Sequence, residues 1–115
     1  MKILFTISLC LIFSLGKAQT AKELIGKWKL VKQTNNGISS TPDNTFQVFM
    51  DGGVFNGING NNSRKGKWKL SDDNKQLTIK ISIISIAFNI DYFDTKKRII
   101  SSSKTGTLEY EKVEE

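Results

Sequence analysis

The chain has 115 residues, with 17 basic and 11 acidic side chains, a single cysteine and no histidine. It therefore lacks the commonest general base, the commonest metal ligand and any internal disulfide, so we expect no enzyme, no metal site and no cofactor. The basic residues are dispersed along the chain, so we also expect no nucleic-acid partner.

The first 18 residues have the pattern of a secretory signal peptide. Lys2 precedes an apolar run from Ile3 to Leu15, and Gly16 and Ala18 place small residues at the −3 and −1 positions of a cleavage site. As a helix this run would rise about 20 Å, less than the roughly 30 Å hydrocarbon core of a bilayer. We predict export to the periplasm or medium, with cleavage near Ala18; a retained membrane anchor is the alternative.

Residues 19–115 are then expected to form one domain without a membrane span. The only cysteine, Cys10, leaves with the signal peptide, and the loss of Lys2 and Lys17 lowers the net charge from +6 to +4. A chain of this length can bury a modest core, about 60–65% of its unfolded surface. We expect a monomer.

One short helical turn and eight strands are predicted in this domain. The turn covers Thr20 to Ile25, with Thr20 as N-cap and Glu23 as its capping-box partner. Turn residues separate the strands, and two longer loops are expected at Asn35–Asn44 and Asn59–Lys65. The expected strands are Gly26–Thr34, Thr45–Met50, Val54–Ile58, Gly66–Ser71, a strand from Gln76 up to a turn or bulge near Ser82–Ser85, Ile86–Phe93, Arg98–Ser103 and Thr107–Val113.

The phrase Gly-Lys-Trp-Lys-Leu occurs twice, at 26–30 and at 66–70. In each copy Trp and Leu alternate with the two lysines, which is typical of a strand with one buried face. Apolar residues also alternate from Leu77 to Tyr92, but they change from odd to even positions near Ser82–Ser85. A one-residue slip moves every side chain to the opposite face, so a turn or a bulge is expected there.

Short connections predict antiparallel pairing between neighbours in the sequence. We therefore predict an all-β, eight-stranded, up-and-down meander that closes into a small barrel, with a half-open meander as the looser alternative. An eight-stranded barrel is just wide enough to be filled by side chains or to hold one small ligand.

The motifs resemble those of the lipocalins, and in particular of small exported bacterial lipocalin-like domains. The matching parts are Gly26 and Trp28, Phe46–Phe49, Asp51-Gly52, the second Gly-x-Trp-x-Leu at Gly66–Leu70, and Asp91-Tyr92. The resemblance implies that Trp28 closes one end of a barrel and that a late-strand cation, Arg98 or Lys112, packs over its indole. The chain is shorter than a typical lipocalin and lacks the disulfide, which implies a smaller cavity.

The function expected from the sequence is non-catalytic binding of a small apolar molecule inside the barrel. Trp28, Trp68 and Arg98 are the expected structural plug. The alternative to a cavity is a filled barrel, in which the apolar side chains of the interior simply form the core. The expected lining residues are Phe46, Val48, Phe55, Leu77, Ile79, Ile81, Phe88, Ile90 and Tyr92.

Two other functions remain open at the level of sequence. One is a protein-interaction module or protease inhibitor, acting through the N-terminal segment Thr20–Ile25 and the loop Asn35–Asn44. The other is a structural or surface component with no pocket.

Overall fold

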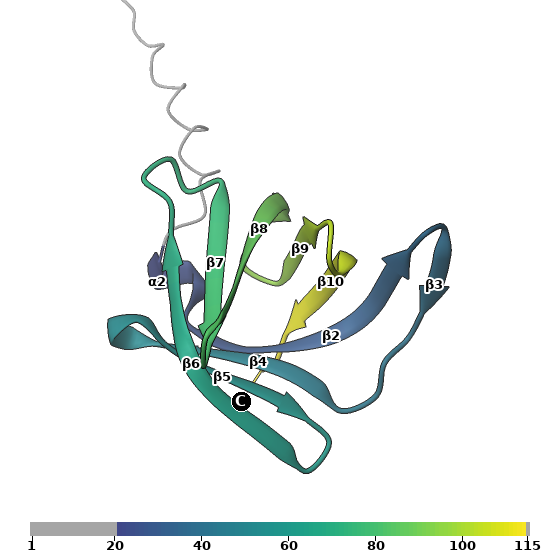
Figure 1. The fold of residues 1–115 in the computed structure, drawn as a ribbon, viewed down its shortest axis with the longest axis horizontal. Helices are drawn as coiled ribbons and strands as arrows, with labels where there is room; N and C mark the ends of the chain where they lie inside the picture. Colours follow the sequence, from purple (N-terminus) through teal and green to yellow (C-terminus); the bar gives the residue numbers. More distant parts are fainter. Residues whose placement is uncertain (1–20, 115) are drawn as a thin grey trace, which may run out of the picture.

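The computed structural model describes residues 21–114, which form one short helix followed by antiparallel strands (Figure 1). The predicted signal peptide and the predicted N-cap Thr20 lie outside the described residues. Helix α2 spans Ala21–Leu24 and lies within the predicted helical turn. In the part of the chain that is described, no helix is long and apolar enough to cross a membrane.

The strands follow the chain as a meander that closes on itself. Each strand of the ring pairs antiparallel with its neighbour, and β10 pairs with β2, which completes a ring of eight. β3 is a ninth, short strand that extends the sheet beside the end of β2. This confirms the predicted all-β closed barrel. The strands are β2 (Gly26–Asn35), β3 (Ile38–Ser40), β4 (Thr45–Met50), β5 (Val54–Asn59), β6 (Asn62–Leu70), β7 (Gln76–Ile81), β8 (Ile84–Phe93), β9 (Lys97–Ser102) and β10 (Gly106–Lys112).

The prediction of two long loops, at Asn35–Asn44 and Asn59–Lys65, was wrong in part, because each range contains strand residues. Asn36 and Gly37 have φ angles of 55° and 79°, the positive pair that a tight hairpin turn needs, and they connect β2 to β3 within the expected loop Asn35–Asn44. β6 begins at Asn62, because the polar residues expected to be loop pair with β5 in an unbroken register. The hairpin expected at Asp51–Gly53 is present as one 3-10 turn, η2.

The phase change between β7 and β8 comes from a tight turn. Ser82 has a φ of 59°, and Ile83 at the tip is 92% exposed. β8 therefore starts at Ile84, two residues earlier than expected.

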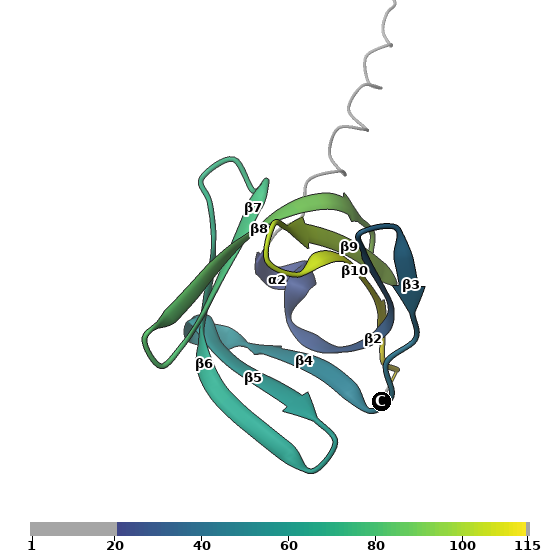
Figure 2. The ribbon, with the colours of Figure 1, turned by 45° about the vertical axis from the view of Figure 1, so that its right-hand side comes forward.

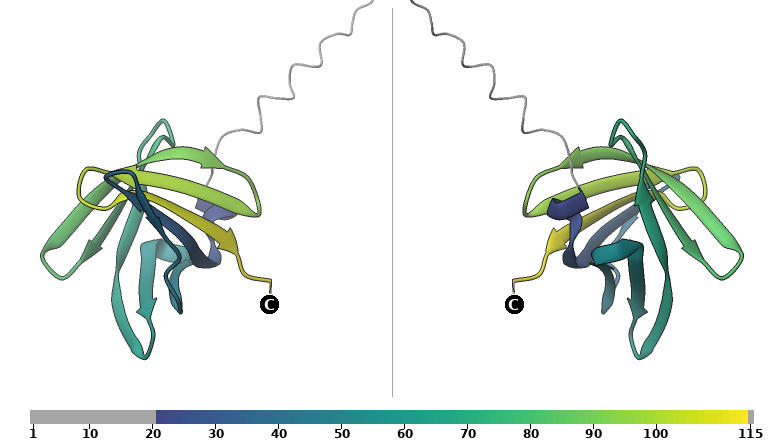
Figure 3. Two further views of the ribbon diagram at one scale, coloured as in Figure 1. Left: turned by 90° about the vertical axis from the view of Figure 1, so that its right-hand side faces the viewer. Right: turned by 90° about the vertical axis from the view of Figure 1, so that its left-hand side faces the viewer.

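The barrel is splayed on one side. β6 pairs with β7 only from Lys67 to Leu70, so the β5–β6 and β7–β8 hairpins point in different directions (Figure 2). Helix α2 lies away from the tips of both hairpins (Figure 3). The core between these ends contains twelve buried apolar or aromatic side chains: Leu24, Trp28, Leu30, Phe49, Phe55, Trp68, Leu77, Ile79, Phe88, Ile100, Leu108 and Tyr110.

Candidate ligand cavity

The end of the barrel beside α2 is closed by Trp28. Its side chain is fully buried, and its indole Nε1 donates a hydrogen bond of 3.0 Å to the carbonyl oxygen of Leu24, the last residue of α2. The Arg98 guanidinium from β9 lies 5.0 Å from the indole ring, and Lys112 Nζ from β10 lies 4.9 Å from it. Both late-strand cations named from the sequence thus lie over the same indole, an arrangement that stabilises by about 0.5–2 kcal/mol per cation.

Arg98 is enclosed by aromatic rings. Its guanidinium lies 5.0 Å from the ring of Phe49 and 4.4 Å from the ring of Tyr110, and its side chain is fully buried. Desolvation lowers the pKa of Arg98 to about 10, so the group still carries its charge at neutral pH. Burial likewise raises the pKa of Tyr110 to about 12, so this phenol keeps its proton at neutral pH.

Trp68 joins the same aromatic layer through Phe49. The ring centroids of Trp68 and Phe49 are 5.7 Å apart in an edge-on arrangement, and Trp68 Nε1 donates to the carbonyl oxygen of Met50 at 3.0 Å. Phe49 in turn contacts Phe55, with centroids 5.2 Å apart. The layer thus runs from Trp28 through Arg98 and Phe49 to Trp68.

Beyond this layer the barrel contains a cavity of about 500 Å³. Apolar side chains from β5, β7 and β8 form its wall, whereas Gln47 and Tyr110 stand at the end nearest Arg98. Asn59, Asn62 and Arg64, all exposed, lie at its rim on the β5–β6 hairpin. The volume falls within the roughly 300–1,000 Å³ of typical small-molecule sites. The apolar lining residues are Phe46, Phe55, Ile58, Ile79, Ile81, Ile84, Ile86 and Phe88.

Five of the nine residues expected at the cavity do line it: Phe46, Phe55, Ile79, Ile81 and Phe88. Leu77 is instead fully buried in the core, and Ile90 packs against that core half-buried. Gln47, Tyr110 and Ile86 line the cavity but were not expected to. The sequence pattern could have indicated Tyr110, whose strand alternation points it inward, and Ile86, which shares the face of Phe88, but not Gln47.

The prediction that Phe46 and Val48 form the inward face of β4 was wrong. Gln47 and Phe49 are buried, so Val48 and Met50 lie on the opposite side of the sheet, where Val48 is half-buried. Phe46 is on the same face of β4 as Val48 and Met50, and Lys27 Nζ lies 4.5 Å above its ring. The inward face carries the polar Gln47 because Arg98 supplies a hydrogen-bond partner there, at 2.7 Å.

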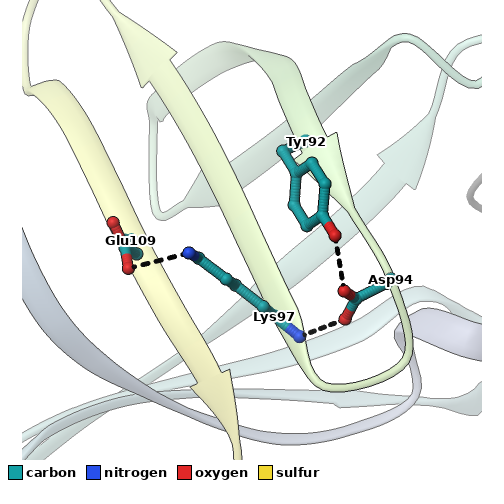
Figure 4. A network of polar contacts seen from close by, with 4 residues as sticks. All are labelled: Tyr92, Asp94, Lys97 and Glu109. Atoms are coloured by element: carbon teal, nitrogen blue, oxygen red, sulfur yellow. Dashed lines mark hydrogen bonds and ion pairs between the residues drawn. The ribbon is translucent and has the colours of Figure 1, made fainter.

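The expectation that Tyr92 lines the cavity was also wrong, because the register between β8 and β9 shifts between Ile90 and Tyr92. This bulge turns Tyr92 outward, 47% exposed, and Phe93 packs inward with its ring 6.0 Å from Trp28. The Tyr92 hydroxyl donates to Asp94 Oδ2 at 2.6 Å (Figure 4).

Asp94 organises the turn between β8 and β9. Its Oδ1 accepts hydrogen bonds of 2.7 Å from the backbone amides of Lys96 and Lys97. The hydrogen bond from Tyr92 and these amides lower the pKa of Asp94, and the same hydrogen bond raises the pKa of Tyr92. Lys97 Nζ also forms an ion pair of 3.4 Å with Glu109 on β10 (Figure 4). This network stabilises a turn and has no access to the cavity, since none of its four residues lines it.

A second hollow, of about 650 Å³, lies on the surface between α2, η2 and the β6–β7 turn. Its lining includes the charged residues Lys22, Asp51, Lys69 and Asp72, so it is less suited to an apolar molecule than the interior cavity. Within the described residues no group of three or more Asp, Glu, His or Cys side chains could hold a metal ion.

The closed meander, the Gly-x-Trp on its first strand and the cation over that indole define a lipocalin-like barrel. The chain has the same fold as a lipocalin-like protein from Bacteroides uniformis, with a TM-score of 0.68 and 19% identity over 79% of this chain and 99% of that one. A second solved structure, an uncharacterized protein from Bacteroides eggerthii, has a TM-score of 0.65 and 18% identity, over 78% of this chain and 99% of that one. No protein-family model and no curated protein matches the sequence.

Proposed function

We propose that the protein is an exported, non-catalytic carrier that binds a small apolar molecule inside the barrel. The observation that supports this proposal is the cavity of about 500 Å³ with its wall of isoleucine and phenylalanine side chains. Burial of a ligand's apolar surface against such a wall contributes about 25 cal/mol per Å². Export is part of the proposal and follows from the apolar segment at residues 3–15.

The test uses residues 19–115 and a neutral fluorescent probe, N-phenyl-1-naphthylamine. We expect saturable binding and a fluorescence increase, because the dye would leave water for the apolar wall. Native mass spectrometry of freshly purified protein would show whether a ligand is carried through purification.

Two variants with the same substitution locate the site. Ile86 is half-buried and lines the cavity, so Ile86→Trp should fill it and weaken probe binding by tenfold or more. Ile38 is 74% exposed on β3, so Ile38→Trp should leave the probe affinity unchanged. The carrier proposal would be refuted if the protein carries no ligand through purification and also binds no probe. It would also be refuted if Ile86→Trp and Ile38→Trp bind the probe with equal affinity.

A further inference from the structure

The turns of the meander divide between the two ends of the barrel. Successive strands run in opposite directions, so η2, the β6–β7 turn and the β8–β9 turn lie with α2 at the Trp28 end. The tips of the β5–β6 and β7–β8 hairpins lie away from α2 (Figure 3), at the same end as the β9–β10 turn and the loop before β4. We call this end the mouth. The cavity reaches it, because Asn62 beside the β5–β6 turn and Ile84 beside the β7–β8 turn both line the cavity.

The tip of the β7–β8 hairpin exposes isoleucine where a tight turn is usually polar. Ser82 and Ile83 are the two turn residues between the paired Ile81 and Ile84. Ser82 has a φ of 59°, which glycine adopts more easily, and Ile83 is 92% exposed. Ile84 is 57% exposed and also lines the cavity. A single exposed apolar side chain needs no explanation, but these two continue the apolar lining of the cavity to the outside.

The mouth also carries cations that lack partners. Four exposed basic side chains lie in or near its turns, and none of them forms an ion pair within the described residues. In the described part of the chain, Asp43, in the loop before β4, is the only acidic side chain in the turns at this end. The turns at the Trp28 end instead contain several aspartates, mixed with lysines. The cations at the mouth are Arg64, Lys65, Lys80 and Lys104, and the aspartates at the opposite end are Asp51, Asp72, Asp73 and Asp94.

An apolar tip between cations is complementary to the surface of an anionic bilayer. Lysine and arginine are attracted to the head groups, and an apolar side chain gains by leaving water for the acyl boundary. The aspartates at the opposite end are repelled by the same surface, so the charge distribution turns the mouth toward it. A soluble polyanion would match the cations but would leave the isoleucines in water.

We propose that the mouth of the barrel docks on the surface of an anionic phospholipid bilayer, with Ile83 among the acyl chains and the four cations at the head groups. In this orientation the cavity opens toward the bilayer, so an apolar ligand would pass between the two without crossing water. That exchange rests on the proposed carrier function, whereas the docking itself does not.

Sedimentation with lipid vesicles tests the docking of residues 19–115. This chain contains the whole barrel and lacks the apolar segment at residues 3–15, which would bind vesicles by itself. We expect about tenfold stronger partition onto phosphatidylcholine vesicles with about 30% phosphatidylglycerol than onto phosphatidylcholine alone, at about 0.1 M salt. The preference should decrease at about 0.5 M salt, because the ions screen the cations.

The contribution of the tip is tested by removing an apolar side chain at either end. Ile83→Asn should weaken partition onto the anionic vesicles by about tenfold, because it removes the inserted side chain. Asparagine is favourable in turns, so this variant is expected to fold. Val54→Asn is the matched control, since Val54 is 42% exposed beside η2 at the Trp28 end, and it should leave the partition unchanged.

Two double variants that remove the same net charge test the cations. Lys65→Gln with Lys80→Gln, at the mouth, should weaken the partition by about tenfold or more. Lys75→Gln with Lys96→Gln, in the turns at the Trp28 end, should weaken it by less than about threefold, because these lysines face away from the bilayer.

A tryptophan placed at either end reports the orientation. Ile83→Trp should shift its emission to the blue on anionic vesicles, because the new indole enters the acyl boundary. Thr95→Trp, at an exposed position in the β8–β9 turn, should show no shift. Trp28 and Trp68 are buried in the folded protein and contribute a constant background.

The docking would be refuted by a protein that does not sediment with anionic vesicles, or that partitions equally onto both kinds of vesicle. A blue shift of Thr95→Trp in place of Ile83→Trp would refute the orientation, and equal losses in Ile83→Asn and Val54→Asn would refute the role of the tip. None of these measurements uses a probe in the cavity, so the docking and the carrier function can fail independently.

Discussion

Closure of the barrel between β10 and β2 can be tested at Gly106. This residue has a φ of +75°, and a Cβ added there would overlap the carbonyl oxygen of Thr34 on β2 and lie 3.1 Å from the Cα of Asn35. Gly106→Ala should therefore strain its own backbone by about 1 kcal/mol. It should also force the two strands apart at a further cost of about 1–3 kcal/mol.

Gly60→Ala provides the matched control. Gly60 has a similar φ of +63°, but a Cβ there meets no atom within 4 Å. Only the backbone strain applies, so we expect a loss of about 1 kcal/mol in the free energy of unfolding, against about 2–4 kcal/mol for Gly106→Ala.

Urea unfolding followed by tryptophan fluorescence measures both losses, because Trp28 and Trp68 are buried in the folded protein. With a slope near 2 kcal/mol per M, Gly106→Ala should lower the midpoint by about 1–2 M and Gly60→Ala by about 0.5 M. Equal losses in the two variants would mean that β10 does not lie against β2 as described, and a cavity inside a closed ring of strands would lose its basis.

Three further predictions follow from the plug and the β8–β9 turn. Between pH 10 and 12 the unfolded chain releases the Tyr110 proton that the folded protein keeps, so the stability of the wild type falls as pH rises. The free energy of unfolding of Tyr110→Phe, measured by urea unfolding, should therefore rise relative to the wild type by about 2 kcal/mol from pH 9 to pH 11.5. A difference between the two proteins that does not change with pH would contradict the burial of Tyr110. Asp94→Ala removes the acceptor of two turn amides and should lower the melting temperature by about 4–8 °C. The control is Thr95→Ala, at the exposed neighbouring position, and an equal decrease there would show that Asp94 does not stabilise the turn. Trp28→Phe loses the hydrogen bond to Leu24 and part of the packed ring, and should reduce the free energy of unfolding by about 2–3 kcal/mol in chemical denaturation; a neutral result would show that the indole is not the plug.

Alternation in the sequence identified the strands whose two faces differ clearly. In β2 and β10 the apolar and polar residues separate cleanly, so the inward positions of Trp28, Leu30, Leu108 and Tyr110 were predicted correctly. The closed meander followed from eight such segments with short connections.

Other positions depend on partners that are distant in the chain. Both faces of β4 contain aromatic residues, and the buried face is the more polar one because Arg98, 51 residues further on, pairs with Gln47. The bulge near Asp91 likewise has no local signal, and it reversed Tyr92 and Phe93. The Asn36-Gly37 turn, by contrast, is a known hairpin signal that the Asn-rich composition of the loop obscured.

The short pairing between β6 and β7 has a consequence for solubility. Within the described residues, Asn62 to Lys65 pair with β5 but with no residue of β7, which leaves backbone donors and acceptors that another chain could match by edge-to-edge association. Arg64 and Lys65 stand on this segment, and like charges on two such edges would repel each other. The polar segment that was expected to be a loop is thus an edge strand whose charges oppose fibril-like stacking, at the shortened contact between β6 and β7.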